Sequence, residues 1–244
     1  SGLFFLKNSK FNTSKAYFSK AKERNSGSIL DIYIANTLYI WSNLKNSDLD
    51  EAKKALDNLD NRFENLKKIQ TAFLNCYFGT DETDILFNEL VKNQNTDFSR
   101  YNYFYAKFLE KSGKKDKAKK IVETSLERFP RNILLNQYKI DLNKPTTNID
   151  FDCKNEKDVI AELLYIAANA LSSQSYFQTS NFYLNLSKYL NNNFYSYDTL
   201  LAENFYKIED LERAKDIYRK LGNNGDAFKW HSSKQISRIL IKKN

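Results

Sequence analysis

One stretch of 34 residues, 99–132, limits what this chain can fold into. Its small and turn-forming residues are spaced around Ala118: Ala106 twelve residues before it, Gly113 five before, Val122 four after, Ser125 seven after and Pro130 twelve after. Small side chains twelve residues apart allow two antiparallel helices to approach closely. Gly113 suits the tight turn between them and Pro130 ends the second helix. The stretch therefore predicts a helical hairpin.

The same spacing occurs elsewhere in the chain. Two stretches share a 34-residue register: Ala168, Ser180, Leu184 and Ser187 in one, and Ala202, Ala214, Tyr218 and Leu221 in the next. Looser versions of the second-helix triplet occur three times: Ser14, Phe18 and Ala21; Ala52, Leu56 and Leu59; Thr83, Phe87 and Leu90. Such a hairpin leaves one apolar face uncovered and must stack on further copies, so we expect an array.

Composition supports an all-α fold. The chain has only 6 Gly and 2 Pro, while 41% of its residues are hydrophobic and 15% are aromatic. Asp48 and Asp210 are expected N-caps. We expect N-terminal repeats in 1–142, an irregular linker in 143–155 and C-terminal repeats in 156–244, all in one continuous superhelix.

This repeat pattern resembles the tetratricopeptide repeat (TPR). The resemblance implies a right-handed α-solenoid of about six to seven helix–turn–helix repeats that acts as a protein-interaction scaffold. Several small positions are Ser or Thr here, and most terminal prolines are replaced by Asn or Ser.

The order of the units is also similar to a bacterial, alphaproteobacterial-type family of TPR repeat-containing proteins. The similar stretches are Ser1-Gly2-Leu3-Phe4, Ala161-Glu162-Leu163-Leu164, Phe182-Tyr183-Leu184 and Ala202–Tyr218. Members often carry an export signal. The expected location is therefore the periplasm or cell envelope if such a signal was removed, and otherwise the cytoplasm.

Charge and cysteine content say little about partners. The formal net charge is +8, but basic and acidic residues alternate as on solvated helix faces, and no clustered basic stripe indicates nucleic acid. Cys76 and Cys153 lie in no CxxC motif, so we interpret them as two isolated thiols. The sequence contains no run of 18 apolar residues, so it predicts no membrane span.

No motif indicates catalysis, a metal or a cofactor. The single His231 has no acidic residue nearer than Asp226, and HExxH, GxSxG and phosphate-loop patterns are absent. The acidic cluster Asp81, Glu82 and Asp84 suits a helix N-terminus. We therefore predict a protein that is not an enzyme.

The resemblance places ligand contacts on the concave face, which the first helix of each hairpin lines. The predicted concave-face residues are Lys68, Asn75, Arg100, Tyr103, Lys107, Lys111, Tyr165, Asn169, Glu203 and Tyr206. Tyr rings supply contact area, Asn amides pair with a peptide backbone and Lys attracts acidic groups, so the expected ligand is an extended protein or peptide segment.

Two alternatives remain open. Residues 227–242 form a predicted helix whose partner lies beyond the end of the chain, so the array could instead self-associate as an assembly module. A nucleic-acid-binding helical repeat is the third possibility, and it requires steeply salt-dependent binding.

Overall fold

The computed structural model describes residues 2–23, 28–92, 99–142, 144 and 150–243. All regular structure in these ranges is helical, and they contain no β-strand. The all-α prediction is thus confirmed. Among the described residues, no helix is long and apolar enough to cross a bilayer.

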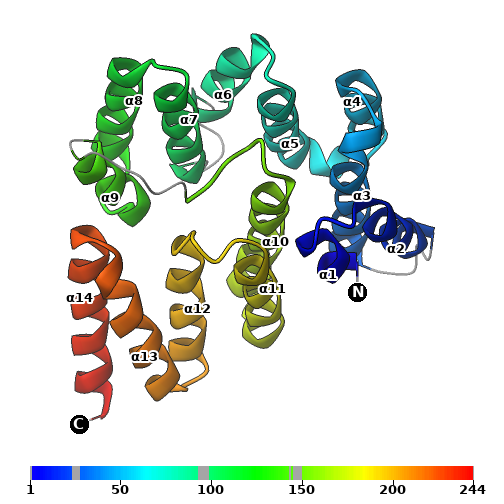
Figure 1. The fold of residues 1–244 in the computed structure, drawn as a ribbon. Helices are drawn as coiled ribbons and strands as arrows, with labels where there is room; N and C mark the ends of the chain where they lie inside the picture. The colour runs from blue at the N-terminus through cyan, green and yellow to red at the C-terminus, as the bar shows by residue number, and fades with distance from the viewer. Residues whose placement is uncertain (1, 24–27, 93–98, 143, 145–149, 244) are drawn as a thin grey trace.

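The α-helices are joined by short connections, apart from the segment between α9 and α10 (Figure 1). Their bounds are α1 Gly2–Lys7, α2 Phe11–Glu23, α3 Ile29–Asn43, α4 Leu49–Asp57, α5 Glu64–Phe78, α6 Glu82–Lys92, α7 Ser99–Lys111, α8 Lys115–Arg128, α9 Ile133–Asp141, α10 Glu156–Ser173, α11 Phe177–Leu190, α12 Ser196–Lys207, α13 Leu211–Leu221 and α14 Asp226–Lys243. Within the described ranges, short 3₁₀ helices also lie at Leu44–Asn46, Asn61–Phe63 and Gly222–Asn224.

Capping side chains fix several helix starts. The carboxylates of Asp48 and Asp210 accept hydrogen bonds from the backbone N–H groups of Glu51 and Arg213, so both predicted N-caps are confirmed. Gly113 has φ +75°, a left-handed conformation that glycine adopts without steric cost, as the tight turn between α7 and α8 requires.

The twelve-residue spacing of small side chains produces close helix contacts. Ala106 and Ala118 are both fully buried between α7 and α8. In the hairpin of α10 and α11, the Ser180 hydroxyl donates to the backbone oxygen of Ala168 at 2.7 Å. The Ser14 hydroxyl makes the equivalent bond to Gly2 at 2.9 Å in the hairpin of α1 and α2. Three hairpins far apart in sequence therefore pack through the same position.

One member of the predicted triplets lies outside the core. Ser14 and Phe18 are buried, but Ala21 is exposed near the end of α2. The predicted inward position of Ala21, two residues before the end of α2, is therefore wrong.

The helices form two rows instead of the single row expected of one continuous superhelix. Figure 1 shows α3 to α9 in the upper row and α10 to α14 in the lower row, with α1 and α2 beside α10 and α11. Helix α10 packs against α3, and α14 packs against α9. The chain therefore folds back after α9, and the two rows face each other.

The predicted linker is where this reversal occurs. Its residues 143 and 145–149 lie outside the described part, while Asp150–Asn155 runs without helix to the start of α10. Phe151 in this segment is buried, and one apolar cluster extends through both rows from Leu3 to Leu201. Phe151 thus ties the described part of the linker, residues 150–155, to the core, and this part crosses the face on which ligand contacts were predicted.

Candidate functional site

The predicted concave face of α7 lies against the lower row. The Arg100 guanidinium donates to both oxygens of Glu162 at 2.6 and 2.8 Å and to the Ser196 hydroxyl at 2.6 Å. Its charged carbon lies 3.8 Å from the centre of the Tyr165 ring. Arg100 and Tyr165 were both predicted as ligand contacts. They instead meet each other between the rows.

Two more predicted ligand contacts, Tyr103 and Lys107, contact the segment 150–155, which leads the chain back to α10. The Tyr103 hydroxyl donates to the Asp150 carboxylate, and the Lys107 ammonium lies 3.4 Å from the same carboxylate. Burial, followed by the Asp150 charge, raises the pKa of Tyr103 well above its usual value. Tyr103 is 2% exposed, so its predicted role as an accessible ligand contact is wrong.

Phe151 anchors this segment between the rows. Its ring centre lies 4.3 Å from that of Phe104, 5.5 Å from that of Phe73 and 6.1 Å from that of Phe194. One residue further on, Asp152 accepts a hydrogen bond from Lys111 at 2.5 Å. Lys107 and Lys111, which were predicted to attract acidic groups of a ligand, thus pair with acidic residues of the chain itself.

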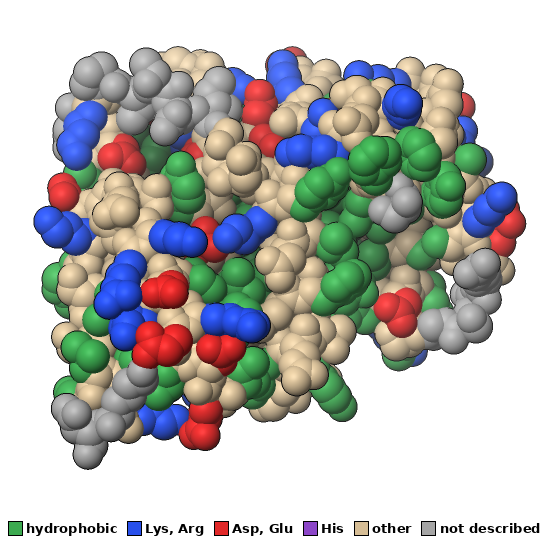
Figure 2. Space-filling model, turned by 60° about the horizontal axis from the view of Figure 1, so that its bottom comes forward, with side chains coloured by type: hydrophobic (Ala, Val, Ile, Leu, Met, Phe, Trp, Pro, Cys, Tyr) green, Lys and Arg blue, Asp and Glu red, His purple; other side chains and the backbone are tan. Residues whose placement is uncertain are grey.

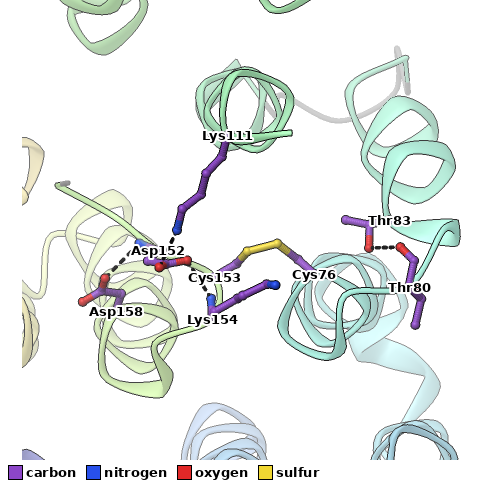
Figure 3. The surroundings of a disulfide bond; sticks show 8 residues. All are labelled: Cys76, Thr80, Thr83, Lys111, Asp152, Cys153, Lys154 and Asp158. Atoms are coloured by element: carbon purple, nitrogen blue, oxygen red, sulfur yellow. Dashed lines mark hydrogen bonds and ion pairs between the residues drawn. A yellow bond between two sulfur atoms is a disulfide. The ribbon is translucent and has the colours of Figure 1, made fainter. Parts of the chain in front are cut away.

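A disulfide holds the same segment to α5. Cys76 and Cys153 are bonded to each other, with their Cα atoms 5.9 Å apart (Figure 3). The interpretation of two isolated thiols is therefore wrong. Their separation of 77 residues gave no local motif, and only the reversal of the chain brings them together.

A groove opens beside the disulfide, and we call it the cystine groove. Its volume is about 750 Å³, within the usual range for ligand sites. It is lined by Cys76, Gly79, Thr80, Asp81, Asp84, Phe87, Phe104, Lys107, Phe108, Glu110, Lys111, Ser112, Lys114, Phe151, Asp152, Cys153 and Lys154. Aromatic rings and the disulfide form its apolar part, and side chains of both charges complete it.

Most charges at the cystine groove are neutralised within the chain. Asp84 accepts hydrogen bonds from Lys114 at 2.7 Å, from Lys117 at 2.6 Å and from Tyr105 at 2.6 Å. Burial opposes the charged form of Asp84, but these bonds outweigh it and hold the pKa of the carboxyl below its usual range. Among the described contacts, the Lys154 ammonium forms no ion pair. Lys154 is therefore the groove cation that remains available to an acidic group.

The other predicted contacts do not gather at this groove. Asn75 is fully buried, and its side chain hydrogen-bonds to Thr71 and Thr80, so its predicted exposure is wrong. Lys68 is exposed on α5, where it pairs with Glu64 at 3.9 Å. Asn169 is exposed on α10.

Glu203 and Tyr206 lie on α12 and face α14. Glu203 accepts hydrogen bonds from Tyr218 at 3.3 Å and from Arg238 at 3.5 Å. The Arg238 guanidinium lies 4.1 Å from the centre of the Tyr206 ring. Of the ten predicted residues, Lys107 and Lys111 line the cystine groove.

Sequence reasoning missed the residues that complete the groove. Phe151, Asp152 and Cys153 lay in the stretch interpreted as an irregular linker. The available signal was the run Asp150-Phe151-Asp152-Cys153, in which a large aromatic residue and a cysteine interrupt an otherwise polar stretch. An apolar residue in such a stretch indicates that the backbone returns to the core.

The remaining chemistry is sparse. Within the described ranges, no three His, Cys, Asp or Glu side chains gather as metal ligands. Burial lowers the pKa of His231, whose ring contacts that of Tyr218.

No protein-family model matches the chain, and no curated protein matches its sequence.

Proposed function

We propose that this chain is a non-enzymatic, TPR-like scaffold that binds an extended segment of a partner protein in the cystine groove. The observation that carries this proposal is a groove of about 750 Å³ with an aromatic interior, built on stacked helical hairpins. The repeated contact at the twelve-residue spacing supports the TPR resemblance.

The chemistry of the groove specifies the partner segment. The half-buried Phe108 ring, beside the buried rings of Phe87 and Phe104, offers contact area to an apolar side chain. Lys154 offers a cation to a neighbouring carboxylate. Lys107 and Lys111 already pair with Asp150 and Asp152. The expected ligand is therefore a short segment with one apolar residue beside one acidic residue.

A disulfide also bears on the compartment. Disulfides persist in oxidising environments and are rare in the cytosol. The bond between Cys76 and Cys153 therefore favours the cell envelope over the cytoplasm as the location of this scaffold.

Selection of peptides displayed on phage against the disulfide-bonded chain tests the groove. Selected peptides are then titrated against the parent, against Phe108→Ala and Lys154→Ala, and against Lys119→Ala as an exposed control outside the groove. We expect both groove substitutions to weaken binding by more than about tenfold, since each removes a principal contact. Selected peptides that bind all four proteins equally would refute the proposed site.

A second function, assembly through the C-terminal helix, has its own support. Trp230, Leu240 and Ile241 on α14 are 67%, 50% and 77% exposed, which is high for large apolar residues. We propose self-association through this helix as the alternative. Light scattering over a range of concentrations tests it: a dimer that disappears in Trp230→Ser/Ile241→Ser supports assembly, and a monomer at every concentration contradicts it.

A further inference from the structure

Aromatic side chains gather on the surface formed by α1, α2 and α11. Phe4, Tyr17, Phe182 and Tyr189 are 54%, 48%, 59% and 41% exposed. We call these four residues the aromatic face. Figure 2 shows hydrophobic side chains collected on this side of the molecule. Monomeric proteins seldom leave large apolar side chains grouped on the surface without a binding role.

Contacts between the helices hold the aromatic face together. The Phe5 ring stacks on Tyr17 with centres 5.3 Å apart, and it lies 5.6 Å from the Phe4 ring. The Lys7 ammonium donates to the backbone oxygen of Leu190 at 2.9 Å and lies 5.7 Å from the centre of the Tyr189 ring. Helix α1 is thereby fixed beside α11, so the face is a built surface.

Positive charge accompanies the aromatic face. Residues 2–23 contain five lysines and one acidic residue, Glu23, giving a net charge of 5 − 1 = +4. The lysines are Lys7, Lys10, Lys15, Lys20 and Lys22. Among the described ion pairs none involves these lysines, whereas lysines on α7, α8 and α13 are paired. Lys7 is engaged by the Leu190 carbonyl, and the ammonium groups of Lys15 and Lys22 lie over the Tyr39 ring without an acidic partner among the described contacts. The exposed Lys10 and Lys20 are therefore the charges most available to an anionic partner.

We propose that the aromatic face and its lysines dock the protein onto an anionic lipid surface. Lysine is depleted at protein–protein interfaces. Lysines mixed with exposed aromatic rings are instead typical of segments that lie in the headgroup region of a bilayer, where rings enter the acyl boundary and ammonium groups attract lipid phosphates. The composition of this surface thus favours lipid over a protein partner.

Flotation with vesicles tests the proposal on the intact, disulfide-bonded chain. Vesicles of phosphatidylcholine containing one third phosphatidylglycerol are compared with vesicles of phosphatidylcholine alone. We expect binding to the anionic vesicles that falls more than about tenfold between roughly 0.05 M and 0.5 M salt, because salt screens the lysines. Absence of binding to anionic vesicles at the lower salt concentration overturns the proposal.

Paired variants assign the binding to this face. Lys10→Glu/Lys20→Glu removes charge from α1–α2, and Lys119→Glu/Lys120→Glu makes the same charge change on the exposed side of α8. Tyr17→Ser/Phe182→Ser removes rings from the face, and Ile85→Ser/Trp230→Ser removes exposed apolar groups elsewhere. We expect binding to the anionic vesicles to fall more than about tenfold in the first variant of each pair and less than about threefold in its control.

Two results contradict the assignment. Equal losses in a variant and its control show that binding is a property of total charge or total apolar surface. A dimer in light scattering that disappears in Tyr17→Ser/Phe182→Ser shows that a second copy of the chain covers this face. These readouts are independent of the cystine groove, so the two proposals stand or fall separately.

Discussion

The Arg100 guanidinium and the Glu162 carboxylate form a bidentate ion pair between the two rows of helices. The Glu162 side chain is fully buried and that of Arg100 is 15% exposed. Burial raises the pKa of Glu162, and the guanidinium offsets part of that rise. Among the ion pairs of the described residues this one is the most deeply buried, and it joins α7 of the upper row to α10 of the lower one.

Removal of one member of this pair is expected to be costly. Glu162→Ala leaves the guanidinium buried without its partner, so we expect a loss of about 3–5 kcal/mol in the free energy of unfolding. Arg100→Met/Glu162→Leu removes both charges and is expected to cost less than Glu162→Ala alone. Urea unfolding of Arg100→Met, Glu162→Leu and the double variant measures the coupling. Additive losses would show that the two charges act independently.

The disulfide is expected to stabilise the fold by restricting the unfolded chain. Cys76 and Cys153 close a loop with a sequence separation of 77 residues, for which chain entropy gives about 4–5 kcal/mol. A dithiol reductant should therefore lower the midpoint of thermal unfolding of the parent. The variant Cys76→Ser/Cys153→Ser should start at the lower value and not respond to the reductant. An equal response of both proteins would contradict the assigned bond.

Asp158 is expected to make stability depend on pH. Burial raises the pKa of its carboxyl to about 6, although the hydrogen bond from the Asp152 backbone N–H opposes the rise. Between the unfolded value near 4 and this folded value, the folded protein binds more protons than the unfolded chain. The free energy of unfolding therefore falls as pH rises through this window, by up to about 3 kcal/mol.

The variant Asp158→Asn isolates this effect. Its side-chain oxygen can still accept the hydrogen bond that Asp152 N–H donates at 2.9 Å, but the side chain carries no charge. We expect the variant to be more stable than the parent at pH 7 and equally stable near pH 3.5, where the parent carboxyl is protonated. Urea unfolding across this range measures the difference, and parallel pH profiles would exclude Asp158 as the cause.

The hairpins could be predicted from sequence because their signals are local. Ala106, Gly113 and Ala118 lie within thirteen residues, and each acts through the helix or turn that contains it. The same holds for the caps Asp48 and Asp210. The spacing of residues is sufficient to predict contacts between helices that are adjacent in the sequence.

The site could not be predicted in the same way because it depends on the reversal after α9. Contacts such as Arg100 with Glu162 and Cys76 with Cys153 span 62 and 77 residues. The hairpin pattern predicts which face of α7 is not covered by α8. It does not predict that the chain returns and covers that face. The sequence associated the lysines of α7 with acidic groups of a ligand, whereas in the structure Lys107 and Lys111 pair with Asp150 and Asp152 of the returning chain.

The helix seam offers a direct test of the repeat architecture. Ala118 is fully buried against α7, whereas Ala21 is exposed on α2, although both occupy the small position of a predicted triplet. Ala118→Leu should force α7 and α8 apart and cost about 1–3 kcal/mol in the free energy of unfolding. Ala21→Leu makes the same chemical change at a solvated site and should alter stability by less than about 0.5 kcal/mol. Denaturant unfolding of both variants gives the comparison. Equal stability of the two would show that Ala118 does not lie in a tightly packed seam, and the twelve-residue spacing would then lose its physical meaning.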